Sequence, residues 1–579
     1  MRKFILNAFV GIVILSLVLA GCSTTGVTQQ PTTAAPESSA TAAGSTATAQ
    51  QSAYNELGAM PITKEKKEIT ILTPWKINAP IDQNWNVIEY EKLSNVKVNW
   101  QTVPSDGWMD KVSVIIASGN LPDAIAAGST FGGSSFTQTQ LDQYGSQGVF
   151  IPLQDLIESD SMYLKQFLAD KPNVKKFVTS LDGNIYGYFD INECYHCNHQ
   201  QKAWINTTWL KNLGLNMPTT TEELKTVLMA FKSQDPNKNG KPDEIPMATA
   251  TGGWRCNLDG FLMCSFIYTD SDQNFIFDSN KKIQYAPAQT AWRDGLKYLA
   301  DLYKNGLIAP ESFTQSTQVL SQTNEAGPDP VIGVGFGGVN FTCSGSAVSD
   351  KFKQYDAIPP LKGPTGYAAA ASYNDMSPAN VGMFVITKAA KEPALIMRWL
   401  DYFYSPVGRD FIDMGLEGRD WRAGDANEFD FNGNQAKYVE LVAHADLINN
   451  NVILEQSLPT IRDAAYREGK KVLSQDWREG KGDGELQLFQ ATKLYDPFAP
   501  APDTLVPTIA ALPDKVTDFS LMKTSISDYV KQYVARFITG DLDINDDAAW
   551  DAYIKGMNDL GLEKYLAICQ EGYDAKYGK

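Results

Sequence analysis

The chain has 579 residues, of which 67 are acidic and 50 are lysine or arginine, so its formal net charge is −17. This acidic balance argues against a nucleic-acid partner, because phosphate binding requires a basic face. Hydrophobic residues make up 43% of the chain and charged residues 20%. That composition is globular, and a chain of this length predicts two or three domains.

The N-terminus predicts secretion and attachment to a lipid. Arg2 and Lys3 precede a nearly uninterrupted apolar stretch, residues 4–20, which runs into Leu-Ala-Gly-Cys22. A basic start, an apolar stretch and small residues at a cleavage site are typical of a secretory signal peptide. The alternative is an uncleaved membrane helix, but the stretch is at the short end of the roughly 17–25 residues that span a bilayer. The small residues before the cysteine resemble the lipobox of bacterial lipoproteins, which implies a signal peptide over 1–21 and a lipid on Cys22.

Residues 22–61 are rich in Ser, Thr, Ala, Gln, Gly and Pro. Such a segment buries too little apolar surface to offset the entropy of ordering it, so we predict a flexible spacer. The protein is therefore expected on the extracellular face of the cytoplasmic membrane, attached at one end.

The first part after the linker alternates strands and helices. Residues 68–75 and 96–103 have strand patterns, and residues 121–125 form a shorter strand signal. Residues 85–93 and 108–118 between them read as helices. This order is typical of a parallel sheet in an α/β fold.

The remaining chain also mixes both element types. Thr220 followed by Glu223 is a capping box, which starts a helix. Further patterns predict an amphipathic helix over 292–303, strands over 331–334 and 381–386, and helices over 395–403, 526–537 and 562–573. We therefore predict an α/β fold throughout.

Residues 235–246, DPNKNGKPDEIP, are the sharpest local motif. Oxygen-bearing side chains occupy positions 1, 3, 5 and 9 with glycine at position 6, which is the spacing of an EF-hand calcium loop. Position 12 departs from that pattern, because it is Pro246, and Glu244 offers a carboxylate instead. A solvated turn is the alternative, but the spacing favours structural Ca2+. The predicted ligands are Asp235, Asn237, Asn239, Lys241 through its carbonyl, Asp243 and Glu244.

Besides Cys22 there are six cysteines: Cys194, Cys197, Cys256, Cys264, Cys343 and Cys569. An even number in an exported chain permits disulfides but does not fix their pairing. The run from Cys194 to His199 holds two cysteines and two histidines, whereas structural zinc usually draws on two separated pairs. Disulfides among Cys194, Cys197, Cys256 and Cys264 are favoured. A metal site, free thiols and a redox pair remain as alternatives.

The sequence marks out no catalytic residues. It contains no Gly-x-Ser-x-Gly, His-Glu-x-x-His or phosphate-binding Gly-rich motif, and it has 3 histidines in all. The many carboxylates leave a glycosidase pair open. We expect a protein without catalysis.

Several segments together resemble the bacterial extracellular solute-binding proteins of family 1, in particular the larger LplA-type lipoproteins and the calcium-containing alginate-binding proteins. They are residues 118–123, 209–225, 235–246, 299–308, 415–418 and 564–573. The resemblance implies a two-lobed periplasmic-binding-protein-like fold of type II, with a mixed sheet and flanking helices in each lobe. It implies an N-lobe over 62–190 with 381–420, a C-lobe over 191–380 with 421–579, and a cleft that closes by hinge motion. The calcium loop would stabilise one lobe away from the ligand.

The resemblance also implies a monomer that captures an oligosaccharide and delivers it to the permease subunits of an ABC importer. Sugar sites pair aromatic platforms with a few polar groups. The candidate ligand-binding residues are Trp75, Asp123, Trp204, Trp254, Arg255, Tyr373, Asn374, Glu417 and Trp421. For each tryptophan, packing in the core is the alternative. A binding protein for a peptide or a metal, and a surface glycan-degrading enzyme, are the competing interpretations.

Overall fold

The computed structural model describes residues 53–75, 79–128, 135–270, 272–340, 345, 349–371, 379–455, 457–479 and 483–578. The predicted signal peptide, the lipidation site Cys22 and residues 22–52 of the predicted linker lie outside these residues. Among the described residues, no helix has the length and apolar character needed to cross a membrane.

A six-stranded mixed sheet forms the first lobe, with strands in the order β14-β4-β11-β3-β1-β2. The strands are β1 (Lys67–Trp75), β2 (Val96–Pro104), β3 (Ala124–Ala126), β4 (Tyr188–Asn192), β11 (Ala379–Ile386) and β14 (Ile461–Arg462). β1 runs parallel to β2 and to β3, as the alternation of strands and helices predicts, whereas β11 is antiparallel to both of its neighbours.

Both faces of this sheet are covered. Successive side chains of a strand point to opposite faces, and accordingly Ile71 and Leu72 belong to two different apolar clusters. Ile71 packs in one cluster with Phe384, and Leu72 packs in the other with Trp108. The surrounding helices are α2 (Trp85–Ser94), α3 (Trp108–Ser118), α4 (Gln138–Ser146), α5 (Gln154–Asp160), α6 (Tyr163–Asp170), α7 (Pro172–Val178), α14 (Pro393–Asp401) and α15 (Pro406–Met414).

A four-stranded sheet in the order β10-β5-β9-β6 forms the second lobe. The strands are β5 (Ala203–Asn206), β6 (Ile245–Met247), β9 (Ile332–Phe336) and β10 (Tyr355–Ile358). The helices are α8 (Thr207–Leu213), α9 (Thr221–Ser233), α10 (Leu258–Met263), α11 (Thr290–Lys304), α12 (Thr317–Glu325) and α18 (Gly484–Lys493). The predicted cap of α9 is present, because the Thr220 hydroxyl accepts a hydrogen bond from the Glu223 amide at 3.1 Å.

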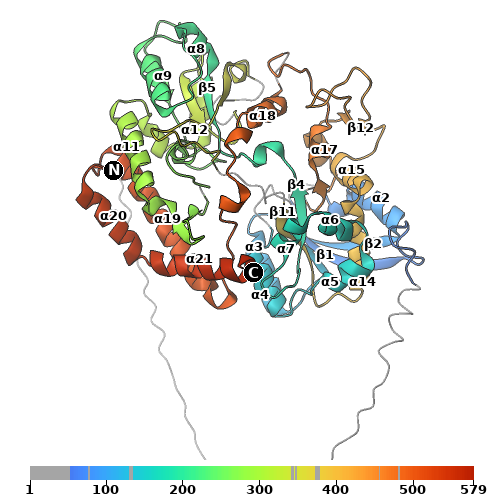
Figure 1. Ribbon diagram of the computed structural model, residues 1–579. Helices are drawn as coiled ribbons and strands as arrows, with labels where there is room; N and C mark the ends of the chain where they lie inside the picture. The colour runs from blue at the N-terminus through green and yellow to red at the C-terminus, as the bar shows by residue number, and fades with distance from the viewer. Residues whose placement is uncertain are drawn as a thin grey trace, which may run out of the picture. The chain divides into compact units, whose positions relative to one another are not determined.

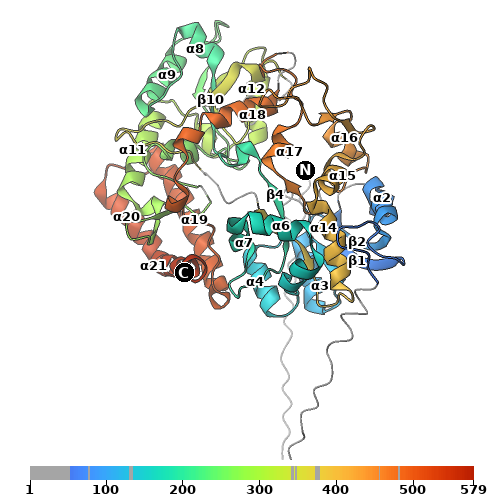
Figure 2. The same ribbon diagram turned by 45° about the vertical axis from the view of Figure 1, so that its right-hand side comes forward.

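Three C-terminal helices extend the second lobe: α19 (Val516–Thr539), α20 (Asp547–Asp559) and α21 (Leu562–Tyr577). α19 lies beside α11, and α20 and α21 pack against α19 (Figures 1 and 2). Aromatic side chains fill the contact; Tyr553 of α20, for example, stacks on Tyr529 of α19 with ring centroids 5.9 Å apart. The apolar stripes predicted over 526–537 and 562–573 belong to these helices.

The chain passes from one lobe to the other more than once. Residues 193–202 connect β4 of the first sheet with β5 of the second. A later passage runs from β14 through α17 (Ala464–Glu468) to α18. β14 pairs with β4 in the first sheet, although it lies within 421–579, the range predicted for the C-lobe. Smaller elements are the pairs β7 (Phe275–Phe277) with β8 (Ile283–Tyr285) and β12 (Trp421–Arg422) with β13 (Val439–Glu440), and helix α16 (His444–Asn449).

Candidate functional site

A cavity of about 930 Å3 is lined by residues of both lobes. This volume lies at the upper end of the range for small-molecule sites, ~300–1,000 Å3. Lys176 and Phe177 of α7 and Asn380 of β11 come from the first lobe. The second lobe contributes residues from 268–281 and 502–509 and from helices α19 and α21.

Aromatic side chains form much of this lining: Phe177, Tyr268, Phe277, Tyr573 and Tyr577. Phe277 and Tyr573 meet edge to face with centroids 5.2 Å apart, and Tyr573 stacks on Tyr577 at 5.5 Å. The buried Tyr577 hydroxyl has no hydrogen-bond partner among the described residues. Flat rings with polar edges suit ligands that carry both apolar faces and hydroxyl groups.

The charged groups of the lining are largely paired with one another. Arg255 donates from Nη2 to Asp272 Oδ2 at 2.7 Å and from Nε to Gln200 Oε1 at 2.8 Å. Lys281 lies 3.8 Å from an Asp503 carboxylate oxygen. The described lining holds four cationic residues, Lys176, Arg255, Lys281 and Lys523, and three acidic residues, Asp270, Asp272 and Asp503. The site therefore has a nearly even charge balance.

Arg255 is the one predicted ligand-binding residue found in the described lining. Its backbone is left-handed, with φ = 58°, which is uncommon for a side chain with a Cβ. The neighbouring Trp254 is 40% exposed and lies over Gly338, where a Cβ would collide with the indole ring. Gly338 is therefore needed for the position that Trp254 takes.

Other predicted residues lie elsewhere and make internal contacts. Trp204 is completely buried in β5, where its indole nitrogen donates to the Gly337 carbonyl at 2.9 Å. This burial matches the alternative of core packing. Trp75 donates to the Ala79 carbonyl at 2.8 Å, and a carboxylate oxygen of Asp123 accepts from the Thr70 amide at 2.8 Å.

Two further candidates, Glu417 and Trp421, form a β-bridge with each other. Glu417 is exposed, and Trp421 packs on Tyr438 with centroids 5.4 Å apart. Tyr373 and Asn374 lie outside the described residues. The aromatic lining of the cavity did not figure among the predicted residues. The available signal was the spacing of Tyr573 and Tyr577, which places both on one face of the last helix.

The oxygen-rich loop follows α9 and folds around its own carboxylates. Asp235 accepts from the amides of Asn239 at 3.1 Å and Gly240 at 3.0 Å. The Asn237 and Asn239 side-chain amides both donate to Asp243 at 3.1 Å. A buried carboxylate oxygen of Glu244 has no hydrogen-bond partner among the described residues.

Burial, together with the charges of Asp243 and Asp235, raises the pKa of Glu244. Gathering these carboxylates is unfavourable unless a cation or a proton compensates them. A carboxylate oxygen without a partner, in a loop of oxygen donors with the correct spacing, fits a hard divalent cation.

Cys194 and Cys197 form a disulfide, so one pair among the four predicted cysteines is present. Both sulfurs are used in that bond, which leaves them unavailable as thiolate ligands for zinc. Burial raises the pKa of the Cys264 and Cys569 thiols to about 12. Cys343 lies outside the described residues.

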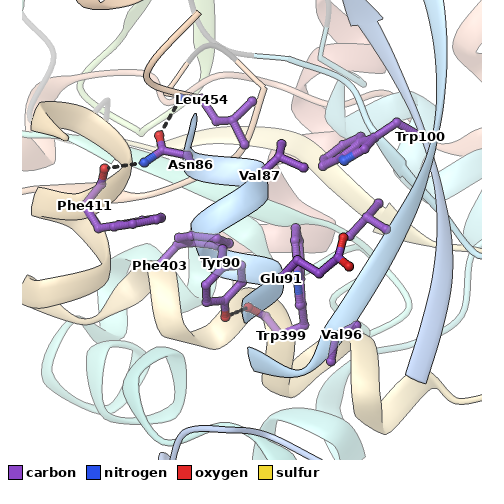
Figure 3. Close-up of a pocket in the computed structure, with 11 residues that line it drawn as sticks. Asn86, Val87, Tyr90, Glu91, Val96, Trp100, Trp399, Phe403, Phe411 and Leu454 are labelled. Carbon is purple, nitrogen blue, oxygen red and sulfur yellow. Dashed lines mark hydrogen bonds between the residues drawn. The ribbon is translucent and has the colours of Figure 1, made fainter. Parts of the chain in front are cut away.

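A second cavity, between α2, β2 and α14, is a packing crevice (Figure 3). Its volume is about 10 Å3, which accommodates a single water molecule at most. Tyr90 and Phe403 fill it with ring centroids 4.7 Å apart, and the Tyr90 hydroxyl donates to the Trp399 carbonyl at 2.7 Å. These contacts hold α2 on the first lobe and leave no room for a sugar.

Comparison with known proteins identifies the family. Residues 76–410 match the bacterial extracellular solute-binding proteins. The fructooligosaccharide ABC transporter substrate-binding protein FusA of Streptococcus pneumoniae is 31% identical over 544 residues, which cover 92% of this chain and 95% of FusA. The structure of FusA in complex with kestose is 26% identical, with a TM-score of 0.67, and the match covers 88% of this chain and 99% of that one.

A solute-binding protein from Bifidobacterium longum infantis, described as HMO-binding and ABC-transporter-associated, has the same fold. It is 22% identical with a TM-score of 0.70 and covers 88% of this chain and 99% of its own. The relatives named here are binding proteins, in agreement with the prediction that the chain is not an enzyme. The family match spans more than half of the chain, and the two lobes have the architecture of these relatives. The chain belongs to the family of bacterial extracellular solute-binding proteins.

Proposed function

We propose that this protein captures an oligosaccharide in the cavity between its lobes and delivers it to an ABC importer. The observation that carries the proposal is the aromatic lining of that cavity, formed by Phe177, Tyr268, Phe277, Tyr573 and Tyr577. Sugars expose apolar CH faces, which stack on such rings, and hydroxyl groups, which need polar partners at the ring edges. The cavity offers polar partners in Asn173, Gln200, Gln273 and Asn380.

The nearly even charge of the lining supports a neutral oligosaccharide. A uronic-acid chain carries one carboxylate on each sugar and would need several available cations. Arg255 and Lys281 already have carboxylate partners, which leaves Lys176 and Lys523 among the cations of the described lining. FusA, named as a fructooligosaccharide ABC transporter substrate-binding protein and solved in complex with kestose, is a relative of this kind. The polygalacturonan/rhamnogalacturonan-binding protein YtcQ of Bacillus subtilis, 25% identical over 369 residues that cover 60% of this chain and 66% of YtcQ, represents the acidic alternative.

A structural Ca2+ in the loop after α9 is part of the proposal. The side chains of Asp235, Asn237, Asn239, Asp243 and Glu244 and the Lys241 carbonyl would hold it. Bound there, the ion would neutralise the carboxylates that the loop gathers and fix the end of α9. A FusA variant described as an EF-hand mutant indicates that a comparable loop exists in that relative.

The proposed location is the outer face of the cytoplasmic membrane, with a lipid on Cys22 and residues 22–61 as the tether. A tethered monomer that moves between a free solute and the permease subunits of the importer fits the length and composition of this linker.

A thermal-shift series tests the ligand class. The purified protein is heated at constant Ca2+ with kestose and nystose, and in parallel with uronic-acid oligosaccharides of equal length. A ligand that binds only the native state stabilises it by about 2.7 kcal/mol at 100 times its Kd. We expect a rise in Tm with a neutral oligosaccharide, which is then recovered intact. A rise in Tm with uronic-acid oligosaccharides alone would mean that the ligand is an acidic oligosaccharide. Recovery of cleaved sugar would indicate an enzyme. No shift with any glycan would favour a peptide or metal ligand.

A further inference from the structure

The Cys194–Cys197 disulfide occupies the chain segment that crosses from β4 of the first lobe to β5 of the second. It closes a short turn of 3-10 helix over Tyr195–Cys197. Disulfides in exported proteins are usually structural, and they then lie in surroundings that do not favour the thiolate. The surroundings of this pair are different.

The two sulfur atoms have unequal environments. Cys194 is buried, with 1% of its surface exposed, whereas Cys197 is half-buried. The Nη2 atom of Arg467 donates to the Cys194 sulfur at 3.6 Å. Both ring nitrogens of His196 lie close to the same sulfur, at 3.3 and 3.4 Å.

Burial opposes a charge on Cys194, and these neighbours offset that effect by favouring a negative charge on its sulfur. A guanidinium beside a sulfur lowers the thiol pKa, because it stabilises the thiolate. Burial, with the charges of Lys202 and Arg467, lowers the pKa of His196 well below its usual value, so the imidazole is neutral and offers one N–H. In a thiol–disulfide exchange, the sulfur with the more stable thiolate is the better leaving group.

We propose that Cys194–Cys197 is an exchangeable disulfide with a fixed polarity, in which an external dithiol attacks Cys197 and Cys194 leaves as the thiolate. The attacking thiolate forms a bond to the Cys197 sulfur, the Cys194–Cys197 bond breaks, and its electron pair goes to Cys194. Arg467 and His196 hold that charge by hydrogen bonds. The second thiolate of the dithiol then attacks the other sulfur of the same dithiol, which is bonded to Cys197 in the mixed disulfide. This releases Cys197, which takes a proton from water. The protein disulfide is thereby reduced and the dithiol oxidised.

Peptide mapping of the folded protein tests the polarity. The native chain is exposed to excess reduced glutathione, trapped after short times with excess iodoacetamide at neutral pH without denaturation, then digested at acid pH and analysed by mass spectrometry. We expect glutathione on Cys197 and the alkyl group on Cys194. The buried thiols Cys264 and Cys569 should stay unlabelled, because exchange occurs without unfolding. Glutathione mainly on Cys194, or labelling of Cys264 at the same rate as Cys194, would overturn the proposal.

Substitution of Arg467 tests the cause of the polarity. Arg467→Gln should slow the appearance of alkylatable Cys194 roughly 5-fold. Loss of a hydrogen bond to a charged group shifts an equilibrium, and part of that shift should appear in the rate at which Cys194 leaves. Arg467→Lys keeps the positive charge and should restore most of the rate. Arg536→Gln is the matched control, because this exposed arginine packs on Tyr533 of α19, among the C-terminal helices. Equal rates for Arg467→Gln and Arg536→Gln in variants with unchanged Tm would refute the role given to the guanidinium.

Discussion

Replacing Arg462 with methionine should destabilise the first lobe strongly. The Arg462 guanidinium donates to Asp190 Oδ2 and to Glu455 Oε2, each at 2.7 Å, and lies 3.4 Å from Asp413 Oδ1. All four side chains are at most 5% exposed. Methionine fills most of the volume but removes the guanidinium from three buried carboxylates, of which Glu455 keeps its contact with His444.

The expected loss follows from the burial of this network. Removing one partner of a buried ion pair costs about 3–5 kcal/mol, because a charge then stays buried without compensation. Typical domains have only about 5–15 kcal/mol of stability in total. The measurement is urea unfolding at pH 7, followed by tryptophan fluorescence, in which the variant should unfold at a clearly lower urea concentration.

A matched control uses the same substitution at a solvated ion pair. Arg478 pairs with Asp356 at 2.7 Å, and the two side chains are 38% and 30% exposed. Solvated pairs contribute about 0–1 kcal/mol, so Arg478→Met should change the unfolding midpoint little. If Arg462→Met costs no more than Arg478→Met, the buried carboxylates do not depend on Arg462 and the reasoning is refuted.

Three further predictions concern pH, metal and ligand. Burial lowers the pKa of His444, but the hydrogen bond and charge of Glu455 outweigh it, so the pKa is raised. The charged His444 therefore stabilises the fold fully below the unfolded pKa of about 6.5, and this stability is lost as the pH rises through the higher folded pKa. His444→Gln should remove this loss from a profile of Tm against pH. Calcium chloride should raise the Tm of the chelator-treated protein, but not that of Asp243→Asn, and an equal rise in both would contradict the assigned ligands. Tyr573→Ala should weaken oligosaccharide binding about tenfold in calorimetry, whereas Tyr573→Phe keeps the ring and most of the affinity. Unchanged binding in the alanine variant would show that Tyr573 does not contact the sugar.

Local sequence patterns were sufficient for most of the secondary structure. The alternation in 68–75 and 96–103 predicted the parallel strands β1 and β2 within one or two residues. The cap at Thr220 marked the start of α9, because a side-chain oxygen accepts from a free amide of the first helical turn. Such signals act over a few residues, so the linear sequence contains them completely.

The sequence by itself therefore predicted an α/β protein of the extracellular solute-binding family, together with the oxygen-rich loop, whose spacing is local. Only the tertiary structure decided which residues face a cavity. Trp204 and Trp254 are both tryptophans in the second lobe, yet one is buried in β5 and the other is 40% exposed. The cavity brings Phe177 together with Tyr573, nearly four hundred residues later in the chain. Likewise β14 joined the first sheet because its backbone hydrogen bonds are made with β4. Such contacts depend on pairing between distant segments, which no local periodicity encodes.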